Sequence, residues 1–277
     1  MNPHEYCQRK AAQSGSSFYY SFLFLPEERR RAITALYAFC REVDDVVDEC
    51  SDVGVARMKL AWWRQEVASA YHGRPQHPVA CALAEVSGRF NLPQQRLQEI
   101  IDGMEMDLDR NRYPDFASLR IYCHRVASVV GLLSAGIFGY QDQRTLEYAA
   151  DLGMAFQLTN IIRDVGEDAR RNRIYLPLDE LREHGVSVAD ITGAHETDSF
   201  RSLIKFQIER ALGFYDRAFS ELPAVDHKSQ RAGLVMAAIY RTLLDEIEAD
   251  GCRVLTRRTS LTPVRKLWIA GKTWVKG

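Results

Sequence analysis

Hydrophobic residues recur every three or four positions along most of the chain, the spacing that places side chains on one face of an α-helix. This period predicts helices over residues 26–50, 55–71, 79–89, 93–109, 115–138, 143–168, 198–221 and 227–250, with Gly and Pro mostly between them. Alternating runs rich in β-branched residues, which are typical of strands, are missing. The pattern therefore predicts an all-α protein of about eight to ten helices.

Two segments interrupt this helical pattern. Residues 169–200 lack the period, and we expect a flexible surface connection there that serves as a lid or a binding loop. The tail, residues 251–277, contains seven Lys and Arg residues, no acidic residue and two Trp residues. Such a basic amphipathic tail either docks on the domain with its charges solvated or makes peripheral contact with an anionic lipid surface.

Composition narrows the possible functions. A length of 277 residues allows one large domain with room for an internal cavity, and we treat residues 1–277 as a single domain. The formal net charge of −1 argues against a nucleic-acid partner. The six Cys residues form no CxxC pair, and no stretch of about 18 apolar residues or signal peptide is evident. These features predict a cytoplasmic protein with reduced thiols.

The first candidate site is an acidic helix end with the sequence DDVVDE. Asp44 and Asp48 lie four residues apart and therefore share a helix face, as do Asp45 and Glu49. Like charges at this spacing repel each other by about 0.2–0.5 kcal/mol per pair. The cluster is either a solvated helix end or a site where a cation compensates the charge.

A second acidic segment favours the cation. Asn160, Asp164 and Asp168 follow one another at intervals of four residues on a helix whose preceding turns are apolar. Ligands that are all oxygen, supplied by two facing helices, suit a hard cation such as Mg²⁺ that bridges to substrate phosphates. The two segments together predict a Mg²⁺-dependent site for a diphosphate.

Arginine residues adjoin both acidic segments. Arg41 precedes the first segment by one turn, Arg163 lies within the second, and Arg170, Arg171 and Arg173 follow it. The guanidinium group has the fork-shaped donor geometry that phosphate oxygens accept. The alternative for each residue is a surface salt bridge, which contributes little to stability.

At these residues the chain resembles the squalene/phytoene synthase family of head-to-head prenyl transferases, over essentially its full length. The matching motifs are SSFYYSFLFLP (16–26), YAFCREVDDVVDE (37–49), YCHRVASVVG (122–131), QLTNIIRDVGED (157–168) and RIYLP (173–177). Within the family it is most similar to the bacterial presqualene diphosphate synthases of hopanoid pathways. The resemblance implies a single-domain isoprenoid-synthase helical bundle around a central apolar cavity.

The resemblance also implies a reaction and roles for individual residues. Two farnesyl diphosphates would condense to presqualene diphosphate with release of diphosphate, using about two or three Mg²⁺ ions and no NADPH. The metal ligands would be Asp44, Asp48, Asn160, Asp164 and Asp168, with support from Asp45 and Glu49. Diphosphate oxygens would contact Ser17, Arg41, Arg163 and Arg173, and the reacting carbons would lie near Phe18, Tyr37 and Tyr240.

The carbocation formed in this reaction must be kept from water, so we expect an apolar cavity wall. Candidate wall residues are Phe18, Phe22, Phe24, Val129, Leu132, Leu133 and Phe156, each of which could equally be ordinary core. Arg125 occupies a position that is aromatic in squalene synthases, and we hypothesise that it holds a product diphosphate.

Three hypotheses about the function remain open at this point. The leading one is a presqualene diphosphate synthase, and the second is a squalene synthase or phytoene synthase on the same scaffold. The third is a non-catalytic assembly factor. That function would be expected if the metal ligands had been lost, but all five candidate ligands are present. Partner enzymes of the same pathway are possible under any of them.

Overall fold

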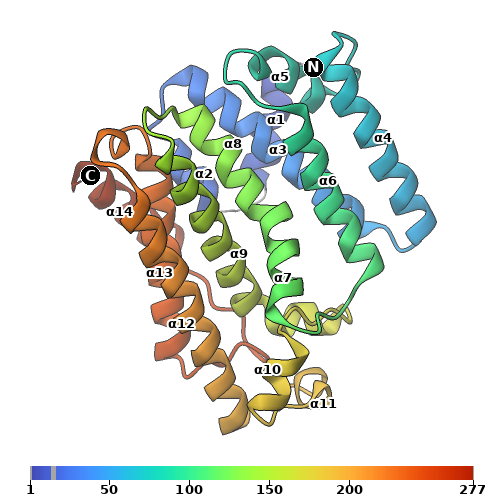
Figure 1. The fold of residues 1–277 in the computed structure, drawn as a ribbon, viewed down its shortest axis with the longest axis vertical. Helices are drawn as coiled ribbons and strands as arrows, with labels where there is room; N and C mark the ends of the chain where they lie inside the picture. The colour runs from blue at the N-terminus through green and yellow to red at the C-terminus, as the bar shows by residue number, and fades with distance from the viewer. Residues whose placement is uncertain (1, 14–16, 277) are drawn as a thin grey trace.

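The computed structural model describes residues 2–13 and 17–276, without the side chains of Ser17, Tyr19, Tyr20 and Lys276. The described residues form helices and no strands (Figure 1), which confirms the predicted all-α fold. In chain order the helices are α1 (Pro3–Gln13), α2 (Ser17–Phe22), α3 (Glu27–Glu49), α4 (Val53–Tyr71), α5 (Pro78–Ser87), α6 (Gln94–Asp109), α7 (Phe116–Cys123), the π-helix η1 (His124–Ser128), α8 (Val129–Phe138), α9 (Arg144–Arg170), α10 (Leu178–Glu183), α11 (Val188–Thr192), α12 (Asp198–Glu221), the 3₁₀-helix η2 (Ala224–Asp226), α13 (Arg231–Ala249) and α14 (Pro263–Lys276).

The hydrophobic core consists of two clusters that meet around a central space. One cluster joins α9, α12 and α13, and the other joins α3, α4, α5, α6 and α8. Phe18, Val126 and Trp274 pack against both clusters. These residues therefore lie where the two halves of the bundle come together.

The segment from α7 to α8 is pressed against α9. A Cβ atom at Gly131 would lie 2.2 Å from the carbonyl oxygen of Ala149, and one at Gly153 would lie 2.5 Å from that of Ala127. Only glycine allows backbones to approach this closely. Ser128 supports the contact, because its hydroxyl donates a 2.8 Å hydrogen bond to the carbonyl of Ala150.

The stretch Phe116–Phe138 is long and apolar enough to cross a membrane by length and composition alone. It is interrupted by η1, and it packs against α3, α6 and α9 inside the bundle. The same composition is expected of the core helix of a bundle, since such a helix is apolar on most of its faces.

The expectation of a flexible connection at residues 169–200 was wrong. The segment contains α10 and α11, and Ile174 and Leu178 donate backbone hydrogen bonds of 3.0 and 2.9 Å to the 111–113 segment. Glu180 is buried and receives hydrogen bonds from Arg210 at 2.5 and 2.9 Å. Buried side chains hold the segment in place through tertiary contacts, and such contacts leave no helical period in the sequence.

The start of α9 is anchored by one buried carboxylate. Asp226 accepts hydrogen bonds from the amides of Gln141 and Asp142 at 2.8 and 3.0 Å, and from the Thr145 hydroxyl at 2.7 Å. Burial opposes its charge, but these donors outweigh burial and hold the pKa of Asp226 below its usual range.

Candidate active site

The bundle encloses a cavity of about 600 Å³ that changes character along its length. On α3 its lining passes from Ile33 to Asp48, residues that are about 22 Å apart at 1.5 Å per helical residue. On α9 it passes from Tyr148 to Asp168 in the same way. The cavity therefore has an apolar end, near the N-termini of α3, α9 and α13, and an acidic end.

Six carboxylates surround the acidic end, and arginines pair with most of them. The Arg41 guanidinium lies 2.6 Å from Asp44 and also contacts Asp45. Across the cavity, Asp48 receives a 2.6 Å hydrogen bond from Arg173 and a 3.0 Å one from Arg171. Arg163 and Arg258 each donate a 2.8 Å hydrogen bond to Asp164. The lining carboxylates are Asp44, Asp48, Asp107, Asp164, Glu167 and Asp168.

The crowding of these carboxylates changes their acidity. Burial, together with neighbouring carboxylates, raises the pKa of Asp44 and of Asp168 to about 7. Burial likewise raises the pKa of Asp107 to about 6, although nearby Arg173 opposes the shift. Burial also disfavours ionisation of Asp164, but hydrogen bonds from its arginine partners outweigh it and lower its pKa. Perturbed carboxyl groups gathered in one cleft are typical of functional sites.

The donor set fits a hard cation. The side-chain oxygen of Asn160 is buried at the cavity and has no hydrogen-bond partner, which is unusual for a buried polar atom. It is joined by carboxylate oxygens, the ligands that Mg²⁺ prefers. As the side chains stand, the described residues contain no group of three or more His, Cys, Asp or Glu side chains that could hold a metal. Arg41, Arg173 and Arg163 now pair with Asp44, Asp48 and Asp164, respectively.

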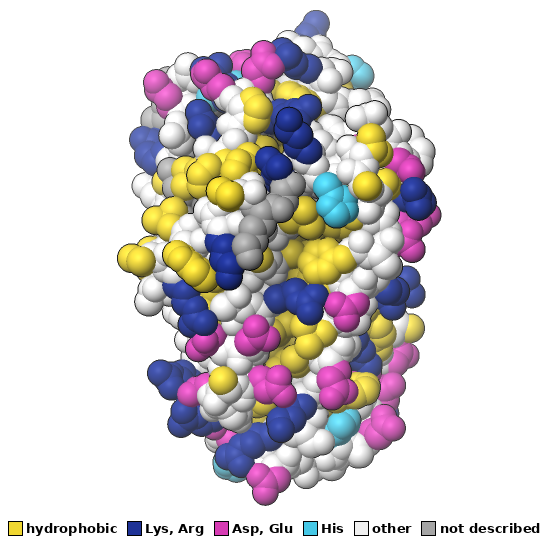
Figure 2. Space-filling model, turned by 90° about the vertical axis from the view of Figure 1, so that its left-hand side faces the viewer, with side chains coloured by type: hydrophobic (Ala, Val, Ile, Leu, Met, Phe, Trp, Pro, Cys, Tyr) yellow, Lys and Arg dark blue, Asp and Glu magenta, His cyan; other side chains and the backbone are white. Residues whose placement is uncertain are grey.

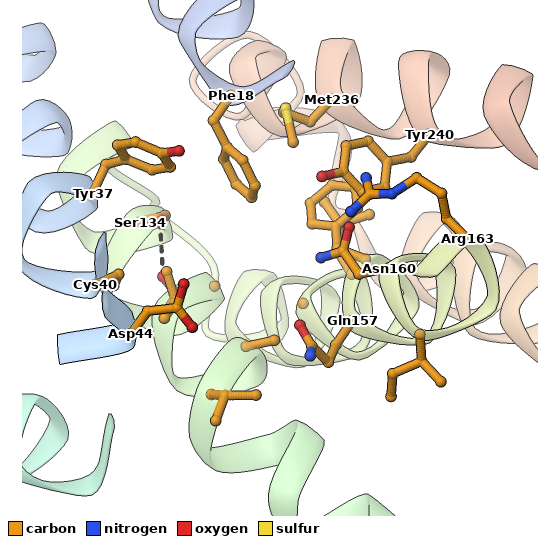
Figure 3. A pocket seen from close by; sticks show the side chains of 18 of the residues that line it. Phe18, Tyr37, Cys40, Asp44, Ser134, Gln157, Asn160, Arg163, Met236 and Tyr240 are labelled. Carbon is orange, nitrogen blue, oxygen red and sulfur yellow. Dashed lines mark hydrogen bonds between the residues drawn. The ribbon is translucent and has the colours of Figure 1, made fainter. Parts of the chain in front are cut away.

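Aromatic side chains line the cavity next to the acidic end (Figure 3). The ring of Phe18 lies 5.7 Å from that of Tyr37 and 6.3 Å from that of Tyr240, measured between centroids. Phe156 lies 5.0 Å from Tyr240. In Figure 3 Arg163 and Asn160 lie on the same side as Tyr240, whereas Asp44 lies on the other side with Tyr37. These aromatic residues line one cavity together with five predicted residues of the two acidic motifs: Asp44, Asp48, Asn160, Asp164 and Asp168.

Other predicted site residues lie elsewhere. Asp45 is not among the lining residues and makes a 2.8 Å ion pair with Lys10 of α1. Arg125 is also outside the lining, and its Cβ atom lies against Gly103 of α6, so this position gives no support to diphosphate binding by Arg125. The side chain of Ser17 lies outside the described residues.

The predicted cavity wall was partly wrong. Phe18, Phe22 and Phe156 line the cavity, but Val129 and Leu133 belong to the core cluster of α3 and α8. Leu132 is not among the lining residues either, and Phe24 is 41% exposed. On the η1–α8 segment the cavity wall is formed instead by Val126, Ala127, Val130, Gly131, Ser134, Ala135 and Phe138.

Sequence reasoning missed four charged groups at the acidic end, one of which is Glu167 of α9, paired with Arg258 at 3.1 Å. Asp107 of α6 accepts hydrogen bonds from Tyr122 and Tyr175 at 2.9 and 2.8 Å. Arg258 and Lys266 reach the cavity from the tail. An acidic residue on the apolar face of the predicted 93–109 helix was a signal for Asp107. The positions of the two cations depend on how the tail folds back, which no local pattern encodes.

The chain belongs to the squalene/phytoene synthase family, since the family model for "Squalene/phytoene synthase" matches residues 11–265. This family acts on prenyl diphosphates, which agrees with a cavity that is apolar at one end and carries cationic side chains at the other.

The similar proteins carry names that refer to different products: phytoene, dehydrosqualene and squalene. The chain is 38% identical to the chloroplastic phytoene synthase of Narcissus pseudonarcissus, over 94% of this chain and 63% of that protein. It is also 38% identical to the phytoene synthase of Arthrospira platensis, over 95% and 90%. A crystal structure of a dehydrosqualene synthase superposes with a TM-score of 0.90 at 26% identity, covering 99% of this chain and 96% of that one. Squalene synthase HpnC from Alicyclobacillus acidocaldarius has a TM-score of 0.79 at 28% identity, covering 90% and 94%.

Proposed function

We propose that the protein condenses two farnesyl diphosphates head to head to presqualene diphosphate, releasing one diphosphate and one proton. The observation that carries this proposal is the polarity of a single cavity. Its apolar end suits prenyl chains, and its opposite end gathers the carboxylates, the unpaired Asn160 oxygen and the arginines that a metal-bound diphosphate needs.

In the proposed reaction, the acidic end holds the diphosphate group. Mg²⁺, bound by Asp44, Asp48, Asn160, Asp164 and Asp168, would neutralise charge on the leaving diphosphate. Arginines that now pair with these carboxylates would turn to phosphate oxygens when the metal takes their place. The guanidinium groups of Arg163 and Arg173 are both mostly buried. Such fixed, desolvated charges stabilise developing negative charge well, because they need little reorganisation.

The aromatic residues would act on the hydrocarbon side of the breaking bond. Phe18, Tyr37 and Tyr240 surround the part of the cavity next to the acidic end. Their ring faces favour a nearby cation, and the apolar lining beyond them excludes water that would otherwise capture it. The role of these residues is to orient the chains and to keep the carbocation dry.

A second candidate is phytoene synthesis from two geranylgeranyl diphosphates. It is favoured by sequence relatives that carry the name phytoene synthase at 35–38% identity. Farnesyl diphosphate is favoured by the dehydrosqualene synthase and squalene synthase names of the structural relatives, because squalene skeletons combine two farnesyl units. The place of the product in squalene and hopanoid synthesis follows only if the first candidate is correct.

The experiment is a product analysis of the purified protein with Mg²⁺ and either labelled farnesyl or labelled geranylgeranyl diphosphate, with and without NADPH. Presqualene diphosphate from farnesyl diphosphate, independent of NADPH, supports the proposal. Phytoene from geranylgeranyl diphosphate alone would support the second candidate, and NADPH-dependent squalene would indicate a complete squalene synthase.

Site variants test the assignment of residues. Asn160→Ala and Asp44→Asn should each lower turnover by at least about a hundredfold, because each removes a group that stabilises charge in the transition state. Asp198→Asn removes an acid on the solvent side of α12 that is 96% exposed, and it should leave turnover unchanged. Full activity in both site variants would contradict the proposed metal and diphosphate site.

A further inference from the structure

Two adjacent acids of α3 face different parts of the protein. Consecutive residues of a helix point about 100° apart, and Asp44 lines the cavity whereas Asp45 does not. The two carboxylates are nevertheless joined by Arg41. Its Nη1 donates a 2.6 Å hydrogen bond to Asp44, and its Nη2 donates to Asp45. Arg41 therefore connects a carboxylate inside the cavity to one outside it.

Helix α1 holds Asp45 from the outer side. The last turn of α1 carries Lys10, whose ammonium lies 2.8 Å from Asp45 and 3.1 Å from Glu42. One turn earlier on the same helix face, the Tyr6 hydroxyl donates a 2.7 Å hydrogen bond to Glu42. Cys7 is fully buried and packs α1 onto the core cluster that contains α3 and α5. These contacts fix the register between α1 and the acidic part of α3.

Asp45 bridges two cations with its two oxygens. Lys10 contacts one carboxylate oxygen, Oδ2, and Arg41 contacts the other, Oδ1. Asp44 has a different environment, because its printed ion-pair partner is Arg41 alone and it faces the cavity. Of the two adjacent acids, Asp45 is thus the one whose position is set from both sides.

These contacts differ from ion pairs of the protein surface. Figure 2 shows Lys and Arg side chains interspersed with Asp and Glu side chains over the lower part of one face, and exposed pairs of that kind contribute little. The side chains of Lys10 and Asp45 are only 24% and 18% exposed. Burial opposes the charge of Lys10, but hydrogen bonds to its two carboxylate partners outweigh burial and raise its pKa. Lys10 is therefore charged throughout the neutral pH range.

The removal of Lys10 would leave Asp45 as a mostly buried anion beside other acids. Asp44 adjoins it, and Glu49 lies four residues further along the helix, a spacing at which like charges repel each other. A mostly buried charge that loses its partner is strongly disfavoured. The Asp45 side chain would then turn toward solvent, and Arg41 would lose the contact at its Nη2 edge.

We propose that Lys10 and Asp45 are positioning residues for Arg41. Lys10 fixes the Asp45 carboxylate, and Asp45 holds one edge of the Arg41 guanidinium so that its other edge points into the cavity. This inference rests on the proposed function, in which Arg41 contacts diphosphate and Asp44 binds Mg²⁺. The edge of Arg41 that now donates to Asp44 would then donate to a phosphate oxygen, while the edge at Asp45 stays in place.

An anchored guanidinium binds phosphate better than a free one for two reasons. A side chain that is already ordered loses less conformational freedom when it binds. A donor that is fixed before the reaction also stabilises developing negative charge without reorganisation. The two adjacent acids thereby have different tasks: Asp44 faces the ligand, and Asp45 orients the arginine.

The test is calorimetric titration of the full chain with inorganic diphosphate in the presence of Mg²⁺. Asp45→Asn should weaken binding by at least about tenfold, because a displacement of about 1 Å in a binding group can cost up to about a hundredfold. Lys10→Met should weaken it several-fold, whereas Lys10→Arg keeps a cation at this position and should restore most of the affinity. The kcat/KM for labelled farnesyl diphosphate should fall by similar factors.

Two further variants separate positioning from a general effect on α1. Glu42→Gln loosens the same contact between α1 and α3 without altering Asp45, so it should bind diphosphate nearly as the wild type does. If Lys10 acts through Asp45, its loss should matter little once Asp45 is neutral. Lys10→Met/Asp45→Asn should therefore bind about as weakly as Asp45→Asn alone. Circular dichroism and urea denaturation would verify that each variant is folded in the assay.

The outcomes distinguish this inference from the proposed function. Diphosphate binding that both Asp45→Asn and Lys10→Met retain would overturn the inference and leave the proposed function intact. An equal loss in Glu42→Gln, or effects of Lys10→Met and Asp45→Asn that simply multiply in the double variant, would also overturn it. A wild-type protein that binds no diphosphate in the presence of Mg²⁺ would overturn the proposed function and this inference together.

Discussion

The substitution Gly153→Ala tests the close contact between η1 and α9 on which the cavity wall depends. The added Cβ would lie 2.5 Å from the carbonyl oxygen and 2.8 Å from the carbonyl carbon of Ala127, and 2.8 Å from Cα of Ser128. All three are backbone atoms, so relief requires a helix to move by several tenths of an ångström. Such overpacking costs about 1–3 kcal/mol, against which the better helix propensity of Ala returns about 0.8–1 kcal/mol.

Gly213 of α12 is the matched control, because a Cβ there meets no atom within 4 Å. Gly213→Ala should therefore stabilise the protein by about 0.8–1 kcal/mol through helix propensity alone. The two variants should differ in free energy of unfolding by about 1–3 kcal/mol, the overpacking term. Urea denaturation followed by circular dichroism measures this difference, provided that the m-value is unchanged.

Because Gly153 also lines the cavity, Gly153→Ala should raise KM or lower kcat, whereas Gly213→Ala should change neither. If Gly153→Ala proved as stable as Gly213→Ala, the helices would not be in the close contact described, and the reasoning about the cavity wall would fail with it.

Three further predictions concern buried charges. Asp226→Asn should lower the free energy of unfolding by about 1.5–3 kcal/mol at neutral pH. Because the folded-state pKa of Asp226 lies below its usual value of 3.8, this difference should begin to shrink as pH falls below 3.8 and be lost as pH falls through the folded-state pKa, which urea titrations at several pH values would show. Glu180→Ala should destabilise the protein by about 3 kcal/mol, since it leaves the guanidinium of Arg210 without its buried partner. Burial raises the pKa of Asp44 and of Asp168 to about 7. Folding is therefore favoured by their protonated forms at low pH, and this stabilisation is lost as pH rises through about 7. Mg²⁺ should offset the loss, so it should raise the melting temperature more above pH 7 than below it.

Controls for these predictions come from the same helices. Arg217→Ala removes an exposed pair with Asp151 from α12 and should change stability by less than about 1 kcal/mol. In Asp44→Asn/Asp168→Asn the added stabilisation by Mg²⁺ above pH 7 should be lost. A melting temperature that responds to Mg²⁺ equally on both sides of pH 7, or equally in this double variant, would refute the assignment.

The local patterns predicted more than the helices. The spacing of Asp44 with Asp48, and of Asn160 with Asp164 and Asp168, placed each set on one helix face, and all five residues line the cavity. The spacing paired Asp45 with Glu49 on a neighbouring face, and the supporting role that the resemblance implied for Asp45 finds no support in the cavity lining. Both members of an adjacent acidic pair look alike in sequence, and the neighbouring helix α1 decides that Asp45 pairs with Lys10 instead.

The chain itself determined the period of its helices and the positions of carboxylates along each of them, because both depend only on the 3.6-residue turn. Tertiary packing decided which helix faces meet. Packing also decided which residues of α8 line the cavity, because Gly131 and Gly153 allow the backbones of the η1–α8 segment and α9 to come into close contact. It also brought Asp107, Arg258 and Lys266 to the acidic end from helices and loops distant in sequence. Contacts across a bundle arise from the joint burial of many faces, and no single stretch of sequence contains that information.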